Sequence, residues 1–209
     1  MKWWKDLSRT SARSPIGCAR LTLPGWTEDT AVSEMRIWRD ECGNVLSLAV
    51  TSVPLTDSER ADETVLRNWC RELAQSRSGG LLEASAIPRG IKLIYKRLER
   101  PAYIYTGMLM TRVRSDWLIW TVVAGEYGIT GVREAVVTAQ LISAGKLAVE
   151  DYERCWSGDP YDPNFSRVDR SVLRSMSDDE SYDAQFPQHP LSKVRYLLAS
   201  LPNHVTYDS

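Results

Sequence analysis

The sequence has no motif that identifies a catalytic or cofactor site. It contains neither of the glycine-rich patterns that bind nucleotide phosphates, G-x-G-x-x-G and G-x-x-x-x-G-K-[ST], nor the G-x-S-x-G of a serine hydrolase. Only two histidines are present, so few sites built on imidazole can be assembled. These absences favour a non-catalytic protein over an enzyme, and we expect no cofactor.

Cysteine pairs and long apolar runs are also missing. The four cysteines, Cys18, Cys42, Cys70 and Cys155, form no C-x-x-C pair, which argues against a zinc ribbon or a dithiol redox centre. The N-terminus is basic but lacks the apolar core of a signal peptide, and no apolar run is long enough to cross a membrane. We therefore expect a reduced, cytoplasmic protein without a membrane partner.

An excess of charge of one sign is absent as well. The net charge is −1, which argues against a nucleic-acid partner, because nucleic-acid binders carry a basic excess. The length of 209 residues and the 43% hydrophobic content fit a soluble globular protein with a real core. Phenylalanine is rare, with two residues against eight Trp and nine Tyr. Those amphipathic rings suit interfaces as well as core filling, and both interpretations stay open.

The most apolar stretch, Pro101–Gly128, is predicted to form the centre of a β-sheet. Two apolar segments flank a polar break at Arg112–Asp116, so they are expected to be antiparallel neighbours. Apolar residues point to both faces of each segment, which predicts a sheet covered on both sides. Gly107, in the middle of the first segment, predicts a bulge or a close approach by an opposing aromatic side chain.

The rest of the first 148 residues predicts an α+β domain, an antiparallel meander with helices packed on its faces. Alternation and turn signals predict strands at 35–39, 45–53, 81–87 and 91–98. Helical spacing predicts one helix from about 57 to 77, with Cys70 on or beside its buried stripe, and another from about 131 to 143 capped by Thr130.

The two ends of the chain differ from this domain. Residues 1–17 are polar and basic and are predicted to form an N-terminal arm, residues 18–148 the α+β sandwich domain, and residues 149–209 an appendage. Between 150 and 183 the appendage has ten acidic residues against four basic ones, and it ends in an amphipathic helix at Leu191–Leu201. A disordered partner-binding tail and a docked appendage are both conceivable; the aromatic residues and the apolar stripe favour docking.

Candidate partner-binding residues lie in three places. The tail offers Trp156, Tyr161 and Asp162 among turn-forming prolines. Glu126 follows a central strand beside a helix N-terminus, where a carboxylate can be functional or can simply complement the helix dipole. Lys96 and Arg97 belong to a basic cluster with Lys92 and Arg100, which suits an anionic partner or, more simply, a solvated strand face.

No catalytic, cofactor-binding or metal-binding residue is assigned from the sequence. A zinc site using His189 or His204 with Asp179 or Asp183 lacks recognisable ligand spacing, and a Cys155–His189 pair lacks a flanking signature. The alternative function is a hydrolase that uses tail carboxylates with His189. It requires one pocket to gather the residues Asp162, Asp179, Asp183 and His189.

The order of the elements resembles that of a known family. With L-P-G-W at 23–26, W-R-D-E-C-G-N at 38–44, a helix, a meander and a closing helix, residues 20–145 look like Mog1/PsbP-like domains, which are α/β/α sandwiches. The resemblance implies a mainly non-catalytic protein that binds partner proteins, and it transfers no site residues. The leading hypothesis is a protein-interaction module, of the kind used by bacterial accessory or toxin-neutralising (immunity-type) proteins, with its oligomeric state left open.

Overall fold

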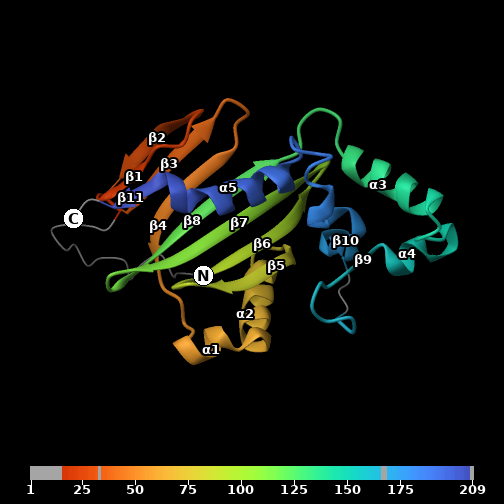
Figure 1. The fold of residues 1–209 in the computed structure, drawn as a ribbon, viewed down its shortest axis with the longest axis horizontal. Coiled ribbons are helices and arrows are strands. Elements are labelled where there is room, and N and C mark those ends of the chain that lie inside the picture. The colour runs from red at the N-terminus through yellow and green to blue at the C-terminus, as the bar shows by residue number, and fades with distance from the viewer. Residues whose placement is uncertain (1–15, 33, 166–168, 208–209) are drawn as a thin grey trace.

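The computed structural model describes residues 16–32, 34–165 and 169–207, and its centre is an antiparallel sheet. Within these residues seven strands pair in the order β2-β3-β4-β8-β7-β6-β5 (Figure 1). The predicted α+β class with an antiparallel meander is confirmed. The predicted N-terminal arm lies almost entirely outside the described residues. The strands are β2 Trp26–Val32, β3 Met35–Asp40, β4 Val45–Thr51, β5 Gly80–Ile87, β6 Gly90–Glu99, β7 Ala102–Val113 and β8 Asp116–Gly125.

The predicted central stretch forms the two neighbouring strands β7 and β8. They pair antiparallel from Ile104 opposite Gly125 to Val113 opposite Asp116, and the chain reverses at Arg114, whose φ is 58°. Side chains alternate between two cores, with Tyr105 and Leu109 on one face and Met108 and Met110 on the other. The prediction of a sheet with two buried faces is therefore confirmed.

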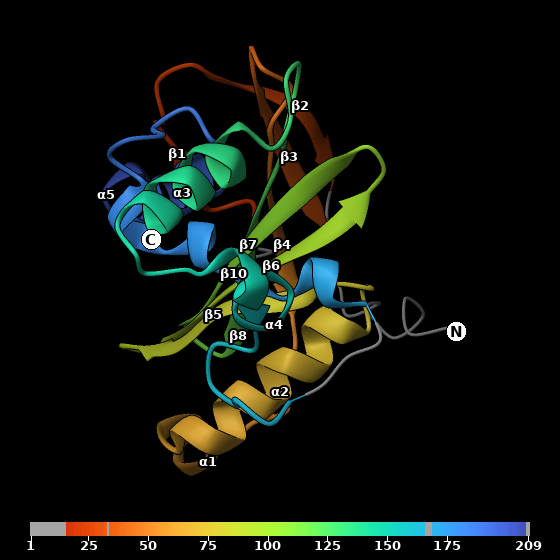
Figure 2. The same cartoon turned by 90° about the vertical axis from the view of Figure 1, so that its right-hand side faces the viewer.

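Two helices distant in sequence cover the two faces of the sheet (Figure 2). Helix α5, Pro190–His204, packs on the Tyr105 face through an apolar stripe that includes Leu191, Val194 and Leu198. Helix α2, Glu63–Gln75, packs on the Met108 face through residues that include Leu66 and Cys70. Cys70 is fully buried, as the spacing predicts. After α5, strand β11, Val205–Tyr207, pairs with β1, Ala19–Leu21, which ties the two ends of the described chain together.

Gly107 sits where α5 crosses β7. A Cβ atom at this position would lie 2.5 Å from Val194 Cγ1 and 2.7 Å from Leu198 Cδ1. The predicted close approach is therefore confirmed, although the opposing side chains are aliphatic. Because a glycine stands here, the helix axis lies closer to the sheet than any larger residue would permit.

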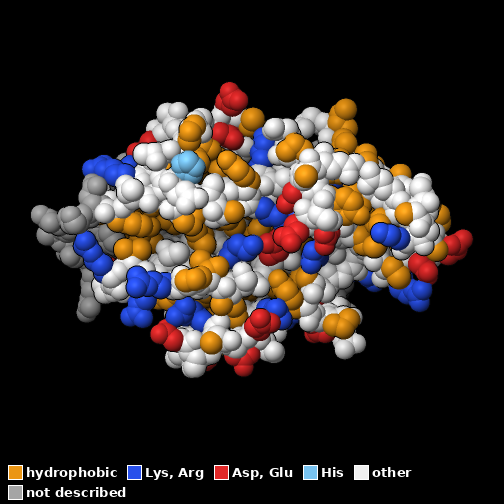
Figure 3. All heavy atoms as spheres, in the orientation of Figure 1, with side chains coloured by type: hydrophobic (Ala, Val, Ile, Leu, Met, Phe, Trp, Pro, Cys, Tyr) orange, Lys and Arg blue, Asp and Glu red, His pale blue; other side chains and the backbone are white. Residues whose placement is uncertain are grey.

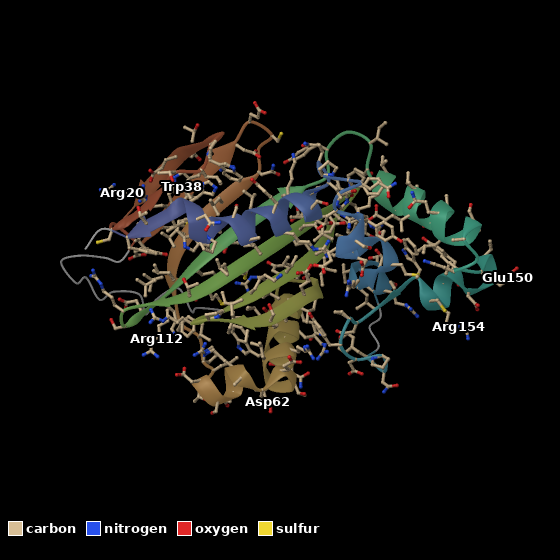
Figure 4. All side chains as sticks on the ribbon, in the orientation of Figure 1. Arg20, Trp38, Asp62, Arg112, Glu150 and Arg154 are labelled. Carbon is tan, nitrogen blue, oxygen red and sulfur yellow. The ribbon has the colours of Figure 1, made fainter. Side chains whose placement is uncertain are left out.

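Two local predictions need correction, and one strand was not predicted. The expected single helix from 57 to 77 is two helices, α1 Asp57–Ala61 and α2, because Asp62 is extended and its carboxylate caps α2 at the junction (Figure 4). Thr130 is not the cap of α3, Val132–Ser143; Gly131 takes that position with φ at 73°. No prediction covered strand β2, whose two charged residues, Glu28 and Asp29, are adjacent in the sequence.

The remaining elements gather beyond one end of the sheet (Figure 1). Helix α3 packs with α4, Tyr152–Cys155, through a small core that includes Val137, Leu141 and Trp156. Short pieces complete this region: β9 Ser157–Gly158, β10 Arg174–Ser175 and the 3-10 turns η1 Val149–Asp151, η2 Arg170–Val172, η3 Met176–Asp178 and η4 Glu180–Tyr182. The division of the chain at residue 148 stays a prediction. Among the described residues, no helix has both the length and the apolar character needed to cross a membrane.

Candidate functional site

A groove of about 630 Å³ opens at the end of the sheet where the loop after β8 meets the N-terminus of α5. Its walls are the turn between β3 and β4 around Cys42, the loop 125–129, the start of α3 and the segment 185–190, with Lys193 at its side. We call it the loop groove. Three stretches distant in sequence build it, because the sheet brings the β3–β4 turn and the end of β8 to the same edge.

The rim of the loop groove is apolar and open to solvent. Hydrophobic side chains cover the loop between β8 and α3 and continue along α3 (Figure 3). Tyr127 and Ile129 are 68% and 86% exposed, and Val132 and Val136, one turn apart on α3, are 45% and 36% exposed. Single exposed apolar residues are ordinary, whereas a contiguous set beside a groove is typical of a binding surface.

Beside the groove lies a half-buried group of ionisable side chains, Glu126, Glu134 and His189, which we call the carboxylate–histidine cluster. Their ligand-type atoms all lie within 4.8 Å of one another. Glu126 directly follows β8, Glu134 is in the first turn of α3, and His189 is the N-cap of α5. Three elements that each start or stop at this edge of the sheet therefore bring the cluster together.

Glu126 is held by backbone donors. Its carboxylate accepts hydrogen bonds from the N–H groups of Tyr103 at 3.3 Å and Gly131 at 3.1 Å. Burial alone would raise the pKa of Glu126, but His189 and these two N–H groups outweigh it and lower the pKa. Gly131 is the N-cap of α3, so its hydrogen bond places the Glu126 carboxylate at the N-terminus of this helix. This contact is the one predicted by the simpler expectation, a carboxylate that complements the helix dipole.

His189 faces the cluster with its Nε2 atom. Its Nδ1 accepts the N–H of Leu191 at 3.2 Å, so the proton of the neutral ring sits on Nε2. That atom is buried and lies 3.7 Å from Glu126 Oε1, which is too long for a direct hydrogen bond. The ring also packs edge-on against Tyr105, with centroids 5.2 Å apart.

Glu134 is the least satisfied member of the cluster. Both of its carboxylate oxygens are buried and have no hydrogen-bond partner among the described residues. Burial raises the pKa of Glu134, and the charges of Asp178 and Glu126 raise it further. Nothing in the sequence indicates that Glu134 belongs to a site, because a glutamate in the first turn of a helix is common and normally stabilises the helix dipole.

Ion pairs fix the walls around the cluster. Lys96 Nζ lies 2.6 Å from Asp178 Oδ2, and both side chains are removed from solvent. Arg133 is fully buried and donates to the Ser177 carbonyl at 2.7 Å and to the Asp183 carboxylate at 2.9 Å. These contacts hold the segment 175–190 against α3 and β6, so that its position does not depend on apolar packing alone.

The predicted partner-binding residues do not form one surface. Lys96 is buried in its ion pair with Asp178, so the expectation of a solvated strand face is wrong for this residue. The spacing of the basic residues could not indicate this pair, because Asp178 is distant in sequence. Arg97 pairs with Glu99 at the surface. Of the six candidates, Glu126 alone lines the loop groove among the described residues.

The tail candidates hold the tail in place. The Tyr161 hydroxyl exchanges hydrogen bonds with the backbone of Ala84, at 2.8 Å and 3.2 Å, and Arg67 lies over its ring. Trp156 stacks on Tyr152 with centroids 5.1 Å apart. Asp162 accepts a turn hydrogen bond from Asn164 N. These contacts anchor the segment 152–165; whether any of them also binds a partner stays a prediction.

The residues of the alternative hydrolase serve separate purposes. His189 lines the loop groove, whereas Asp179 lines a different pocket beside Glu83 and Arg195. Asp183 is engaged by Arg133 and Arg195, and Asp179 caps the 3-10 turn η4. The carboxylates nearest to His189 are Glu126 and Glu134, which differ from those that the tail composition indicates.

Comparisons with known proteins add little beyond the fold. No protein-family model matches the chain, and no curated protein matches it. Among solved structures, the chain is similar to the Ran-binding protein Mog1p of Saccharomyces cerevisiae, with 7% identity and a TM-score of 0.47 over 91% of this chain and 90% of that chain. At this identity and TM-score, we draw no conclusion about family, function or residue roles from the likeness.

Proposed function

We propose that the protein is a non-catalytic interaction module and that the loop groove with its apolar rim is the binding surface. The observation that carries the proposal is the contiguous exposure of Tyr127, Ile129, Val132 and Val136 beside a groove. Side chains of this kind gain free energy when a partner removes them from water, about 25 cal/mol for each Å² of apolar surface.

The chemistry of the groove supports one kind of partner. Lys193 lines the groove, and its amino group approaches Cys42 Sγ at 3.9 Å but has no carboxylate partner among the described residues. A protein segment that places an apolar side chain in the groove and an acidic residue beside it would satisfy both features. A toxin neutralised by this chain is one special case of such a partner.

A peptide-display selection tests this proposal. The immobilised chain should enrich peptides that combine an apolar anchor with an adjacent Asp or Glu. Binding of the enriched peptides should fall at least tenfold with Ile129→Asp, which places a charge on the rim, and also with Lys193→Glu. Tyr196→Asp is the matched control, because Tyr196 is 69% exposed on α5 and does not line the groove. Enriched peptides that bind equally well to both groove variants would contradict the proposal.

A further inference from the structure

The carboxylate–histidine cluster has an imbalance of charge that the protein does not resolve. Around it, Lys96 is committed to Asp178, and Arg133 to Asp183 and two backbone carbonyls. No Lys or Arg of the described residues forms an ion pair with Glu126 or Glu134. Two carboxylates therefore share a buried site with one histidine, although buried charges are normally paired or bind metal ions.

Unpartnered polar atoms concentrate in the same place. Eight buried side-chain nitrogen and oxygen atoms of the described residues have no hydrogen-bond partner. Five of them lie in or beside the cluster: both Glu134 oxygens, His189 Nε2, Tyr105 Oη and Asp178 Oδ1. Such groups are rare in proteins, and an ion or water that completes their coordination is a usual explanation.

We propose that Glu126, Glu134 and His189 bind one divalent transition-metal ion of the zinc type. One imidazole nitrogen with two carboxylates suits Zn²⁺ or Co²⁺, whereas Mg²⁺ and Ca²⁺ select all-oxygen sites. With metal–ligand bonds of about 2.1 Å, the ligand atoms of a tetrahedral ion lie about 3.4 Å apart. The ligand-type atoms of the cluster lie within 4.8 Å of one another. Side-chain movements of roughly 1–1.5 Å would therefore close the site.

The outer contacts of the Glu126 carboxylate resemble those of a ligand in a built metal site. The N–H groups of Tyr103 and Gly131 hold the Glu126 carboxylate from behind, as supporting hydrogen bonds do around bound metals. The His189 and Glu126 side chains are 8% and 6% exposed, so the ligands are shielded from water. Both residues also line the loop groove, which offers an entry path for the ion.

Metal binding must change the tautomer of His189. In the metal-free chain Nδ1 accepts the Leu191 N–H, so the proton is on Nε2. Coordination through Nε2 moves this proton to Nδ1 and breaks the capping hydrogen bond. The imidazole ¹⁵N shifts of His189 therefore give a readout that separates coordination from general stabilisation of the fold.

Titration with Co²⁺ and Zn²⁺, with buffer metal removed beforehand, tests the site. We expect one equivalent of Co²⁺ to produce weak visible bands without a thiolate charge-transfer band, and Zn²⁺ to displace it. Affinity should fall at least tenfold in Glu134→Gln and in His189→Asn; asparagine retains a capping oxygen for α5 but lacks the imidazole. The His189 tautomer should switch on addition of Zn²⁺ to the unsubstituted chain.

Two controls address the other ligands that a metal could find. His204→Asn and Cys42→Ser should leave the affinity unchanged, and circular dichroism of every variant checks that it is folded. The proposal is overturned if binding is not saturable at one equivalent, or if folded Glu134→Gln and His189→Asn bind as the original chain does. It is also overturned if His204→Asn or Cys42→Ser abolishes binding. None of these results depends on the peptide-binding proposal.

Discussion

Lys96 and Asp178 form an ion pair across 82 positions of the chain, with Nζ 2.6 Å from Oδ2 and both side chains at most 2% exposed. The pair joins the middle of β6 to the 3-10 turn η3. Ser175 completes the site, because its N–H and its hydroxyl both donate to the Asp178 carboxylate. Although burial would raise the pKa of Asp178, Lys96 and Ser175 outweigh it and lower the pKa.

Removal of one member of this pair should destabilise the fold strongly. Asp178→Asn leaves the Lys96 ammonium buried without a counter-charge, so we expect a loss of about 3–5 kcal/mol in the free energy of unfolding. Urea denaturation at pH 7 measures it. The matched control is Arg97→Ala, which breaks the exposed pair with Glu99 and should change stability by less than about 1 kcal/mol. A loss below about 1 kcal/mol for Asp178→Asn would show that the pair is not buried.

A methyl group at position 107 should disturb the contact between α5 and β7. Gly107→Ala places a Cβ against Val194 and Leu198, and overpacking of this kind typically costs about 1–3 kcal/mol. The melting temperatures of Gly107→Ala and of the control variant Gly158→Ala, measured by thermal unfolding, test this expectation. A Cβ at Gly158 meets nothing within 4 Å, so its replacement should have little effect. Equal melting temperatures for the two variants would mean that α5 lies farther from the sheet.

Asp159 should contribute to the loss of stability in acid. Its carboxylate takes two hydrogen bonds from Arg71, at 2.7 Å and 2.9 Å. Burial would raise the pKa of Asp159, but Arg71 and the N–H groups of Tyr161 and Asp162 outweigh it, so the folded-state pKa lies below the unfolded value. The stabilisation is therefore present above the unfolded pKa of about 3.9 and is lost as the pH falls through the folded-state pKa.

The measurement is the free energy of unfolding against pH, for the original chain and for Asp159→Asn. The variant should be less stable at pH 7 and should lose less stability than the original chain between about pH 4 and pH 2. Parallel curves would rule out a depressed pKa at Asp159.

The four cysteines should differ in reactivity. Cys70 lies on the face of α2 that packs on the sheet, and this burial raises the pKa of its thiol to about 12, so the thiolate that reacts is absent at neutral pH. Cys42 and Cys155 are exposed. Brief treatment of the native chain with iodoacetamide at pH 7.5, followed by mass spectrometry, should find Cys42 and Cys155 modified and Cys70 unmodified, with Cys70 reacting after denaturation. Equal modification of Cys70 and Cys42 in the native chain would contradict its burial.

The sheet could be predicted because its signals are local. The alternation in 101–125 and the stripe from Leu191 to Leu201 each report a buried face within a few residues, and the structure confirms both. Strand β2 was missed because its adjacent charged residues, Glu28 and Asp29, interrupt the alternation that indicates a strand. The cap of α3 was misassigned because Gly131 takes a left-handed conformation that lets it replace Thr130.

The candidate site could not be predicted, because it depends on contacts between distant segments. Glu126 and Glu134 approach His189 only after α5 has packed on the sheet, about 60 positions further along the chain. Lys96 looks like a surface residue in the sequence, since nothing near it indicates Asp178. Spacing within the sequence indicates which residues are neighbours on one helix or strand. This site, in contrast, forms where the ends of three different elements meet.

The most direct test of the proposed interaction surface is a map of where a selected peptide contacts the chain. Amide chemical shifts of the ¹⁵N-labelled protein should change on peptide addition at residues 125–136 and 185–193, the walls and rim of the loop groove, and should stay constant along 92–100. Shift changes confined to the basic 92–100 strand or to the anchored segment 152–165 would place the binding surface elsewhere and contradict the account.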